Sequence, residues 1–375
     1  MSRIHLPFRR AAGRDAETRM SKAPCPDTSQ HQPTLIGLAS AVPKSWSQQD
    51  LHEQILRHWY RRLPAAESLI QHSGVERRHL YLDPFEAMRA PRMPTGDRMR
   101  LWKQGAMDLS RRSMTEALAG FDTRLLGSLV MVSCTGYDTP SPDLLLAEEL
   151  GLSPHLRRTF VGHMGCFAAF NGLKVALDAL AARPDEAALV VCTELSSVHL
   201  RDEATVEQAV CHALFADASV ALLIANAPPG TGPRFLHGHT QTLYAHTDAM
   251  GWSILNDGFR MHLSPEVPSL LEGAARGFVE RLLEPPGLQP QDIQHWMLHP
   301  GGPSIVKAVG RALDLSEQDL VPTREVLRTH GNCSSATVLL VLQHVMNEVR
   351  PRPGEYGVML GFGPGLTLEG MVLRF

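Results

Sequence analysis

The stretch GCFAAFNGLKVALDALAARP, residues 165–184, decides the fold, because it joins a single cysteine to a long run of helix-forming residues. The run predicts a helix that starts behind Cys166 and stops before Pro184, since proline disfavours the helical conformation in the residue before it. Short apolar runs at 126–136 and 187–195 lie on either side of this helix and are typical of buried strands. Strands that alternate with helices indicate a layered α/β fold.

The same order of elements recurs in the second half of the chain. It predicts a strand at 293–302, a helix at 303–315, a helix at 331–349 and a strand at 356–365. Equivalent features lie about 166 residues apart, which is too long for a solenoid repeat and indicates a duplicated domain. Clefts form where domains meet, so we expect a site between two similar lobes. The predicted organisation is a mobile N-terminal extension over 1–33, a first lobe over 34–228 and a second lobe over 229–375.

The repeat brings three residues into matching positions. Cys166 stands at a helix start in the first lobe, Asn332 stands at the equivalent helix start in the second, and His299 ends a strand of the second lobe. A helix N-terminus and a neighbouring imidazolium both stabilise a thiolate, which predicts a Cys–His ion pair. His299 and Asn332 also predict two hydrogen-bond donors for an oxygen that becomes negative during thioester chemistry.

Each of these residues also has an ordinary explanation. A cysteine before a helix is usually buried packing material, and an asparagine before a helix is a common N-cap. A histidine before Pro-Gly-Gly is often a plain loop residue. The matched placement of all three across an internal repeat favours a shared site.

Composition narrows the class of protein. Hydrophobic residues make up 43% of the chain and charged residues 20%, with a formal net charge of −3, so no overall basic field favours nucleic acid. No apolar run has the length of a membrane span. The six cysteines form no C-x-x-C pair, which favours a reducing cytoplasm and argues against structural zinc. HGH at 237–239 is expected to be a loop with two solvated imidazoles, and we predict no metal site.

Four stretches together resemble the type III polyketide synthases, the chalcone-synthase-like enzymes of the thiolase superfamily. They are GCFAAFNGLKVALDAL, HPGGP at 299–303, GN-x-SSA at 331–336 and GFGPG at 361–365, and the resemblance runs from about residue 34 to the C-terminus. It implies a thiolase-like fold with two duplicated α/β lobes in a five-layered αβαβα arrangement. Related ketoacyl-carrier-protein synthases share a Cys–His–Asn site but differ around the histidine and in the final glycine loop.

The resemblance implies roles for individual residues. Cys166 matches the nucleophile that carries the acyl chain, while His299 and Asn332 match the pair that stabilises the enolate formed from malonyl-CoA. Phe215 matches an aromatic gatekeeper between the CoA tunnel and the cavity. Malonyl-CoA and an acyl-CoA starter are the implied partners of a homodimer that uses no metal, cofactor or carrier protein. The other implied substrate-binding positions are Met261, Cys134, Thr135, Ser196, His199, Ser304, Ser334, Gly361, Gly363, Pro364 and Gly365.

Departures from the plant pattern bear on the product. Met261 stands where plant enzymes usually have a second gatekeeper phenylalanine. Methionine adapts to irregular apolar ligands, which favours a long or apolar starter over an aromatic one; the alternative is that Met261 is simply a packing residue. Cys134 either lines the starter pocket or belongs to the core, and His199 stands near a cavity threonine of the plant enzymes. For the CoA phosphates, no assignment follows from the nearby arginines, which are Arg61, Arg62, Arg77 and Arg78.

The leading hypothesis is iterative decarboxylative Claisen condensation of malonyl-CoA onto an acyl-CoA starter held on Cys166, giving an alkylpyrone or alkylresorcinol. Two enzymatic alternatives are a starter-free synthesis of a polyhydroxynaphthalene and a ketoacyl synthase III-like condensation. A non-catalytic scaffold is a third class, and the complete set of Cys166, His299 and Asn332 argues against it.

Overall fold

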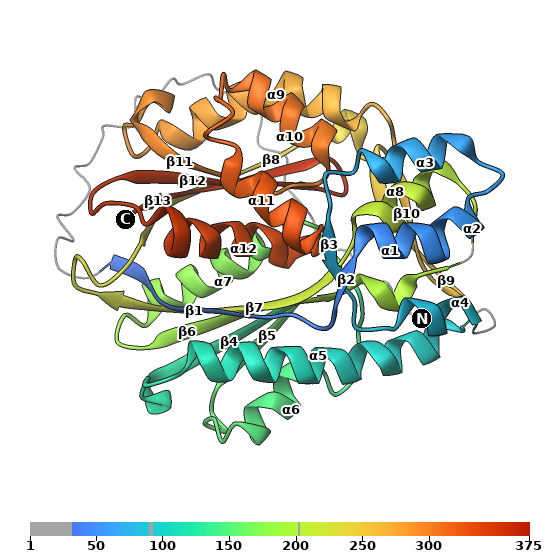
Figure 1. The fold of residues 1–375 in the computed structure, drawn as a ribbon. Helices are drawn as coiled ribbons and strands as arrows, with labels where there is room; N and C mark the ends of the chain where they lie inside the picture. Colours follow the sequence, from blue (N-terminus) through green and yellow to red (C-terminus); the bar gives the residue numbers. More distant parts are fainter. Residues whose placement is uncertain (1–31, 90–92, 202) are drawn as a thin grey trace, which may run out of the picture.

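The computed structural model describes residues 32–89, 93–201 and 203–375, so nearly all of the predicted N-terminal extension lies outside the described residues. Its central feature is a nine-stranded mixed sheet (Figure 1). In spatial order the strands are β11 (Ile293–Leu298), β12 (Tyr356–Gly363), β13 (Thr367–Arg374), β8 (Arg234–Thr242), β1 (Gln32–Ala41), β7 (Asp217–Ala227), β6 (Ala187–Leu195), β4 (Leu126–Ser133) and β5 (Arg157–Gly162).

The strand order is symmetric about the junction between β8 and β1, where the pairing consists of Thr34 with Arg234. From this junction outward, each half of the sheet has two antiparallel pairings and then a parallel one. The half that begins with β1 has one further parallel pairing, of β4 with β5, which has no counterpart in the other half. In this symmetry β11 corresponds to β4 and β12 to β6, as the internal repeat predicts. The strands expected at 126–136, 187–195, 293–302 and 356–365 are β4, β6, β11 and β12.

The elements form five layers (Figure 1). Helices α7 (Ala168–Ala182) and α12 (Thr337–His344) lie between the two halves of the sheet. All nine residues of β6 are buried, as expected of a strand covered on both faces. The outer layers are α5 (Thr95–Ala117) with α6 (Pro142–Glu149) on one side and α9 (Val267–Leu283) with α10 (Pro303–Ala312) on the other. The predicted αβαβα arrangement is therefore confirmed.

Smaller elements cover the end of the sheet at which the predicted site residues lie (Figure 1). They are β2 (Ser45–Ser47), α1 (Gln48–Leu51), α2 (Arg57–Trp59), α3 (Pro64–Gln71), β3 (Arg77–His79), α4 (Pro84–Arg89), α8 (Val206–Leu214), β9 (Met250–Leu255) and β10 (Gly258–Leu263). Helix α11 (Val321–His330) lies beside α12. Within the described ranges, no helix combines the length and the apolar character needed to cross a membrane.

Two local expectations were wrong. HGH at 237–239 lies in β8 rather than in a loop, because His237 and His239 pair with Val372 and Gly370 of β13. The helix expected at 331–349 begins only at Ser334: a 3-10 turn at Ser334–Ala336, α12 and a π-helical turn at Val345–Val349 follow one another without a gap. Ser334 has a φ of 48°, which a continuous right-handed helix cannot include.

Candidate active site

Cys166 lies in the loop between β5 and α7, directly before the N-cap residue Phe167. Gly165 has a φ of 91°, and a Cβ atom there would lie 2.2 Å from Cδ of Pro364. A Cβ on Gly363 would lie 2.8 Å from Cδ1 of Phe167. Both glycines are therefore required for the cysteine loop and the GFGPG loop to approach each other this closely.

Asn332 is fixed through both its backbone and its side chain. Its backbone N–H donates to the carbonyl of Leu214 at 2.7 Å, in a parallel bridge that pairs it with Phe215. Its side-chain oxygen accepts a hydrogen bond from the Ser334 backbone N–H at 2.9 Å. The Thr337 hydroxyl, which lies 2.8 Å from the Ser334 carbonyl, shares its proton with this oxygen at 3.3 Å. With the oxygen held in this way, the side-chain NH2 is the group left to donate to a substrate.

His299 follows β11 directly, and its backbone N–H donates to the carbonyl of Leu360 at 2.7 Å. Both ring nitrogens are buried and have no hydrogen-bond partner among the described residues. Burial lowers the pKa of His299 to about 3, so the imidazole is neutral.

Burial acts on Cys166 in the opposite direction. It raises the pKa of the thiol to about 12, and a hydrogen bond with the Ser334 side chain only partly offsets this effect. The buried site thus favours a neutral thiol and a neutral imidazole over the ion pair expected from the sequence, because desolvation penalises both charges. Attack by the sulfur then requires transfer of its proton as the thioester approaches.

Cys166, His299 and Asn332 line one small cavity of about 20 Å³, together with the predicted gate residues Phe215 and Met261. Sequence reasoning did not assign the remaining wall, although Gly301 stands in the HPGGP motif and Phe362 in the GFGPG motif. The other wall residues look like core residues in the sequence; they are Val210, Leu214, Met250, Leu263 and Ile305.

A larger cavity of about 710 Å³ lies on the outer side of this small one. The two share Val210, Leu214, Leu263, Gly301 and Ile305, so the large cavity is an entrance to the small one. Ser304, expected beside the pantetheine arm, lines this entrance. Among the residues that the structure describes, its lining contains His72 and Glu207 but no lysine or arginine, and therefore none of the four arginines considered for the CoA phosphates.

A third cavity, also of about 20 Å³, lies behind Phe215 and is lined by Ser196, His199 and Trp252 among others; we call it the inner chamber. Phe215 lines both small cavities, and its ring packs edge-on against Trp252 with centroids 5.9 Å apart. The sulfur atoms of Met261 and Cys211 lie 3.6 Å apart across the same partition. Phe215 is therefore placed between two spaces, as a gatekeeper has to be.

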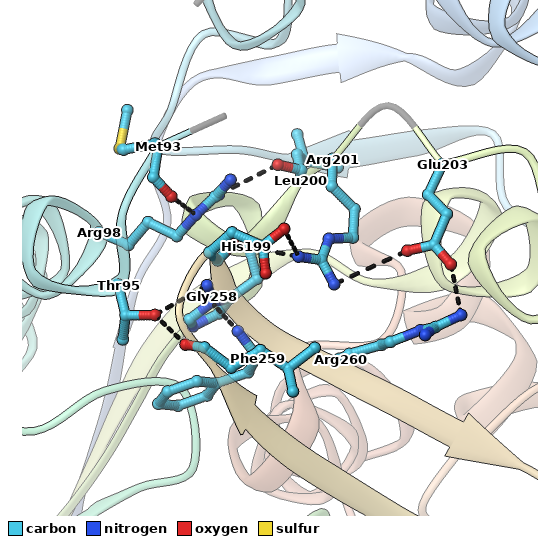
Figure 2. Close-up of polar contacts among 12 residues, drawn as sticks. Met93, Thr95, Arg98, His199, Leu200, Arg201, Glu203, Gly258, Phe259 and Arg260 are labelled. Atoms are coloured by element: carbon cyan, nitrogen blue, oxygen red, sulfur yellow. Dashed lines mark hydrogen bonds and ion pairs between the residues drawn. The ribbon is translucent and has the colours of Figure 1, made fainter. Parts of the chain in front are cut away.

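Polar contacts join the turn after β6 to the β9–β10 hairpin (Figure 2). His199 Nε2 lies 2.7 Å from the carbonyl of Thr135, and Nδ1 accepts the Phe259 backbone N–H at 3.1 Å. Arg201 forms an ion pair with Asp257 at 2.6 Å. The contacts of His199 with Thr135 and Phe259 place its ring proton on Nε2 and engage both ring nitrogens. His199 thus shapes the inner chamber but has no ring nitrogen left for a substrate.

Cys134 and Thr135 do not line any of these three cavities. The Cys134 sulfur lies 3.0 Å from the N and 3.2 Å from the O of Gly165, so it supports the loop that carries the nucleophile. The buried Glu194 carboxylate accepts hydrogen bonds from the Cys134 N–H at 2.9 Å, from the Thr135 hydroxyl at 2.8 Å and from the Ser335 hydroxyl. The expected substrate contacts of Cys134 and Thr135 are replaced by these internal ones.

The remaining predicted positions lie around the cysteine. The side chain of Ser334 acts to lower the pKa of the Cys166 thiol, and the Gly365 N–H donates to the carbonyl of Met250 at 3.2 Å. Gly361 packs against Phe170, since a Cβ there would lie 2.4 Å from Cε2 of that ring. The glycine loop therefore contacts the cavity through Phe362, while Gly361, Gly363 and Pro364 support it from outside.

Comparisons with known proteins identify the family of the chain. Family models described as chalcone and stilbene synthases match residues 29–228 (N-terminal domain) and 236–375 (C-terminal domain). A 3,5-dihydroxyphenylacetyl-CoA synthase of Amycolatopsis orientalis is 35% identical over 83% of this chain and 86% of its own length. An alpha-pyrone synthesis polyketide synthase-like protein of Mycobacterium tuberculosis is 31% identical over 97% of this chain and 96% of its own.

A solved structure shows the same fold. The crystal structure of a polyketide synthase from the brown alga Ectocarpus siliculosus superposes with a TM-score of 0.87 at 28% identity, covering 93% of this chain and 99% of that one. The family models, the relatives and the shared fold agree, and the chain belongs to the chalcone and stilbene synthase family of type III polyketide synthases.

Proposed function

We propose that Cys166 carries the acyl chain of an iterative decarboxylative Claisen condensation that uses malonyl-CoA as the extender. The observation that carries the proposal is the meeting of Cys166, His299 and Asn332 on one cavity that opens into a roomy entrance. Apart from the thiol, the site holds two neutral polar groups in apolar surroundings, which suits an oxygen that gains charge away from water.

The Cys166 sulfur attacks the starter thioester, its proton passes to His299, and CoA leaves as the thiol after taking up that proton. Malonyl-CoA then loses CO2, and the electron pair of the broken C–C bond forms an enolate held by hydrogen bonds from His299 and Asn332. The enolate carbon attacks the acyl carbonyl on Cys166 and expels the sulfur as a thiolate, which takes up one proton from solvent to restore the thiol. No strong base is needed, so we also propose that the reaction uses no resident metal or organic cofactor; EDTA should leave CO2 release unchanged.

Cys166→Ala tests this assignment. The variant should lose acylation of the protein, which intact-protein mass spectrometry measures after incubation with an acyl-CoA. Cys211→Ala is a matched control at another buried thiol. An acyl adduct of unchanged stoichiometry in Cys166→Ala contradicts the nucleophile assignment.

For the product, an acyl-CoA starter leading to an alkylpyrone or alkylresorcinol remains our first proposal. The apolar entrance and Met261 support it, and one relative is named for alpha-pyrone synthesis. A starter-free synthesis of a small polyhydroxylated aromatic is the second candidate. Two narrow cavities of about 20 Å³ each favour it, and another relative is named for a dihydroxyphenylacetyl product. Malonyl-CoA alone should give product only under the second proposal, and added fatty acyl-CoA should be required under the first.

We further propose a cytoplasmic homodimer. The described cysteines are free thiols, which suits a reducing compartment. Tyr137 and Met164 are 45% and 40% exposed near the cysteine loop, and apolar side chains of this size are typical of interface centres. Light scattering on a gel-filtration column should give twice the mass of 41.2 kDa.

A further inference from the structure

Helix α8 lies between the entrance and the inner chamber. One face of the helix lines the entrance, and another face lines the inner chamber. Val206, Val210 and Leu214 line the entrance. Gln208, Cys211, His212 and Phe215 line the inner chamber. Residues three and four positions apart share a helix face, so the α8 sequence places a histidine on the face that meets the chamber.

His212 is 2% exposed and uses one of its ring nitrogens. Nδ1 lies 2.7 Å from the Tyr60 hydroxyl, and the ring packs against Trp59 with centroids 5.1 Å apart. Nε2 is buried and, among the described residues, has no hydrogen-bond partner. The hydroxyl of Ser196, on the same chamber, is buried and unpartnered in the same sense.

His199 provides an internal comparison, because it lines the same chamber with both of its nitrogens engaged (Figure 2). Folded proteins pair nearly all buried polar groups, so two unpaired ones on a single chamber point to a ligand. The inner chamber has a volume of about 20 Å³, which exceeds the ~10–15 Å³ that one water-sized group requires. The chamber is far too small for a ring or an alkyl chain.

Resting on the function proposed above, we propose that Nε2 of His212 and the hydroxyl of Ser196 bind one keto or enol oxygen of the growing poly-β-keto chain behind Phe215. His212 is then a specificity-determining residue: it fixes one oxygen and so selects how the chain folds before release. Tyr60 orients the ring, and when its hydroxyl donates to Nδ1 the proton lies on Nε2 and donates to a keto oxygen. Burial lowers the pKa of His212 to about 3, so the bound oxygen meets a neutral imidazole.

Two substitutions of similar size separate the two nitrogens. His212→Gln places an amide near the position of Nε2, whereas His212→Asn places one near Nδ1 and keeps only the side facing Tyr60. The assay supplies malonyl-CoA, with the starter that the enzyme requires, and measures the ratio of full-length product to early-released lactones by mass spectrometry, per CO2 formed. We expect His212→Gln to stay within twofold of the wild-type ratio and His212→Asn to fall about fivefold or more. Equal ratios in the two variants overturn the proposal, because His212 then acts only as a packing residue or as the partner of Tyr60.

Ser196→Ala provides a second test that does not depend on the folding of the His212 variants. It should lower the same ratio, while Ser269→Ala on the exposed surface of α9 should not. An unchanged ratio in Ser196→Ala with normal CO2 release refutes the oxygen site alone. Absence of CO2 release from the unaltered protein refutes the proposed function instead.

Discussion

The backbone of Phe215 pairs with that of Asn332, although the two residues belong to different halves of the chain. Asn332 N–H donates to the Leu214 carbonyl at 2.7 Å, and Ala216 N–H donates to the Asn332 carbonyl at 2.9 Å. The residue that divides the cavities and the residue that would hold the enolate are therefore parts of one rigid unit. A displacement of the gate also displaces the hydrogen-bond donor.

Arg78 supports this unit from beneath, and its removal should disturb both residues. Its guanidinium is buried and donates to the Phe215 carbonyl at 3.0 Å and to the Gln48 side chain at 2.8 Å. We expect Arg78→Met to lower stability by about 3 kcal/mol, because it leaves two buried acceptors unpaired. In the protein that still folds, kcat for CO2 release should fall more than KM rises.

Denaturant unfolding and steady-state kinetics measure these two effects. Arg77→Met is the matched control, since the Arg77 side chain is exposed and donates to the Ser45 hydroxyl of β2; this substitution should cost less than about 0.5 kcal/mol. Equal behaviour of the two variants contradicts a supporting role for Arg78.

Met261 should set the length of the accepted starter. It is 5% exposed, lines the cavity of Cys166 and contacts Cys211. Met261→Phe should shift a panel of acyl-CoA starters toward shorter chains, because a rigid ring cannot adapt its shape as methionine does. Met261→Leu conserves volume and should leave the profile nearly unchanged. If the phenylalanine variant folds and keeps the wild-type profile, Met261 does not limit the chain.

Malonyl-CoA binding should depend only weakly on salt concentration, because of the residues that line the entrance. Its lining offers the CoA phosphates no lysine or arginine, so little electrostatic attraction is available for salt to screen. KM for malonyl-CoA should change less than about twofold between ~50 mM and ~500 mM NaCl. Ser68→Lys, which adds a cation on α3 at this cavity, should lower KM and make it salt-dependent. A steep salt dependence in the unaltered protein would place phosphate-binding cations outside the described cavity lining.

Stability should fall as the pH is lowered from 7 to 5. Burial lowers the pKa values of His199, His212 and His299 to about 3, whereas in the unfolded chain they titrate near their ordinary value of 6.5. Below pH 6.5 the unfolded chain therefore binds protons that the folded protein rejects, and each histidine can contribute up to about 1.4 kcal/mol per pH unit. Asp217 opposes this trend, because burial raises the pKa of its carboxyl to about 6.

Urea unfolding midpoints at pH 7, 6 and 5 test this prediction. His212→Gln removes one of the three buried histidines and should make the pH dependence shallower. The same dependence in both proteins would mean that His212 does not contribute to it.

Much of the fold was determined by local sequence. The strand expected at 187–195 is β6 with the same limits, because a continuous apolar run between polar turns has few alternatives. The repeat likewise predicted that Cys166, His299 and Asn332 would come together, and they line one cavity. Local sequence did not predict the strand that contains His237 and His239. That segment is a strand because it pairs with β13.

The sequence by itself determined the layered fold, the family and the three candidate catalytic residues, because these depend on patterns and motifs that lie within short segments. Only the tertiary structure decided that Cys134 supports Gly165, that His199 has no free nitrogen and that His212 faces the chamber behind Phe215. These outcomes depend on contacts between segments far apart in the chain. Which polar atoms those contacts satisfy, and which they leave for a substrate, is settled by packing rather than by residue type.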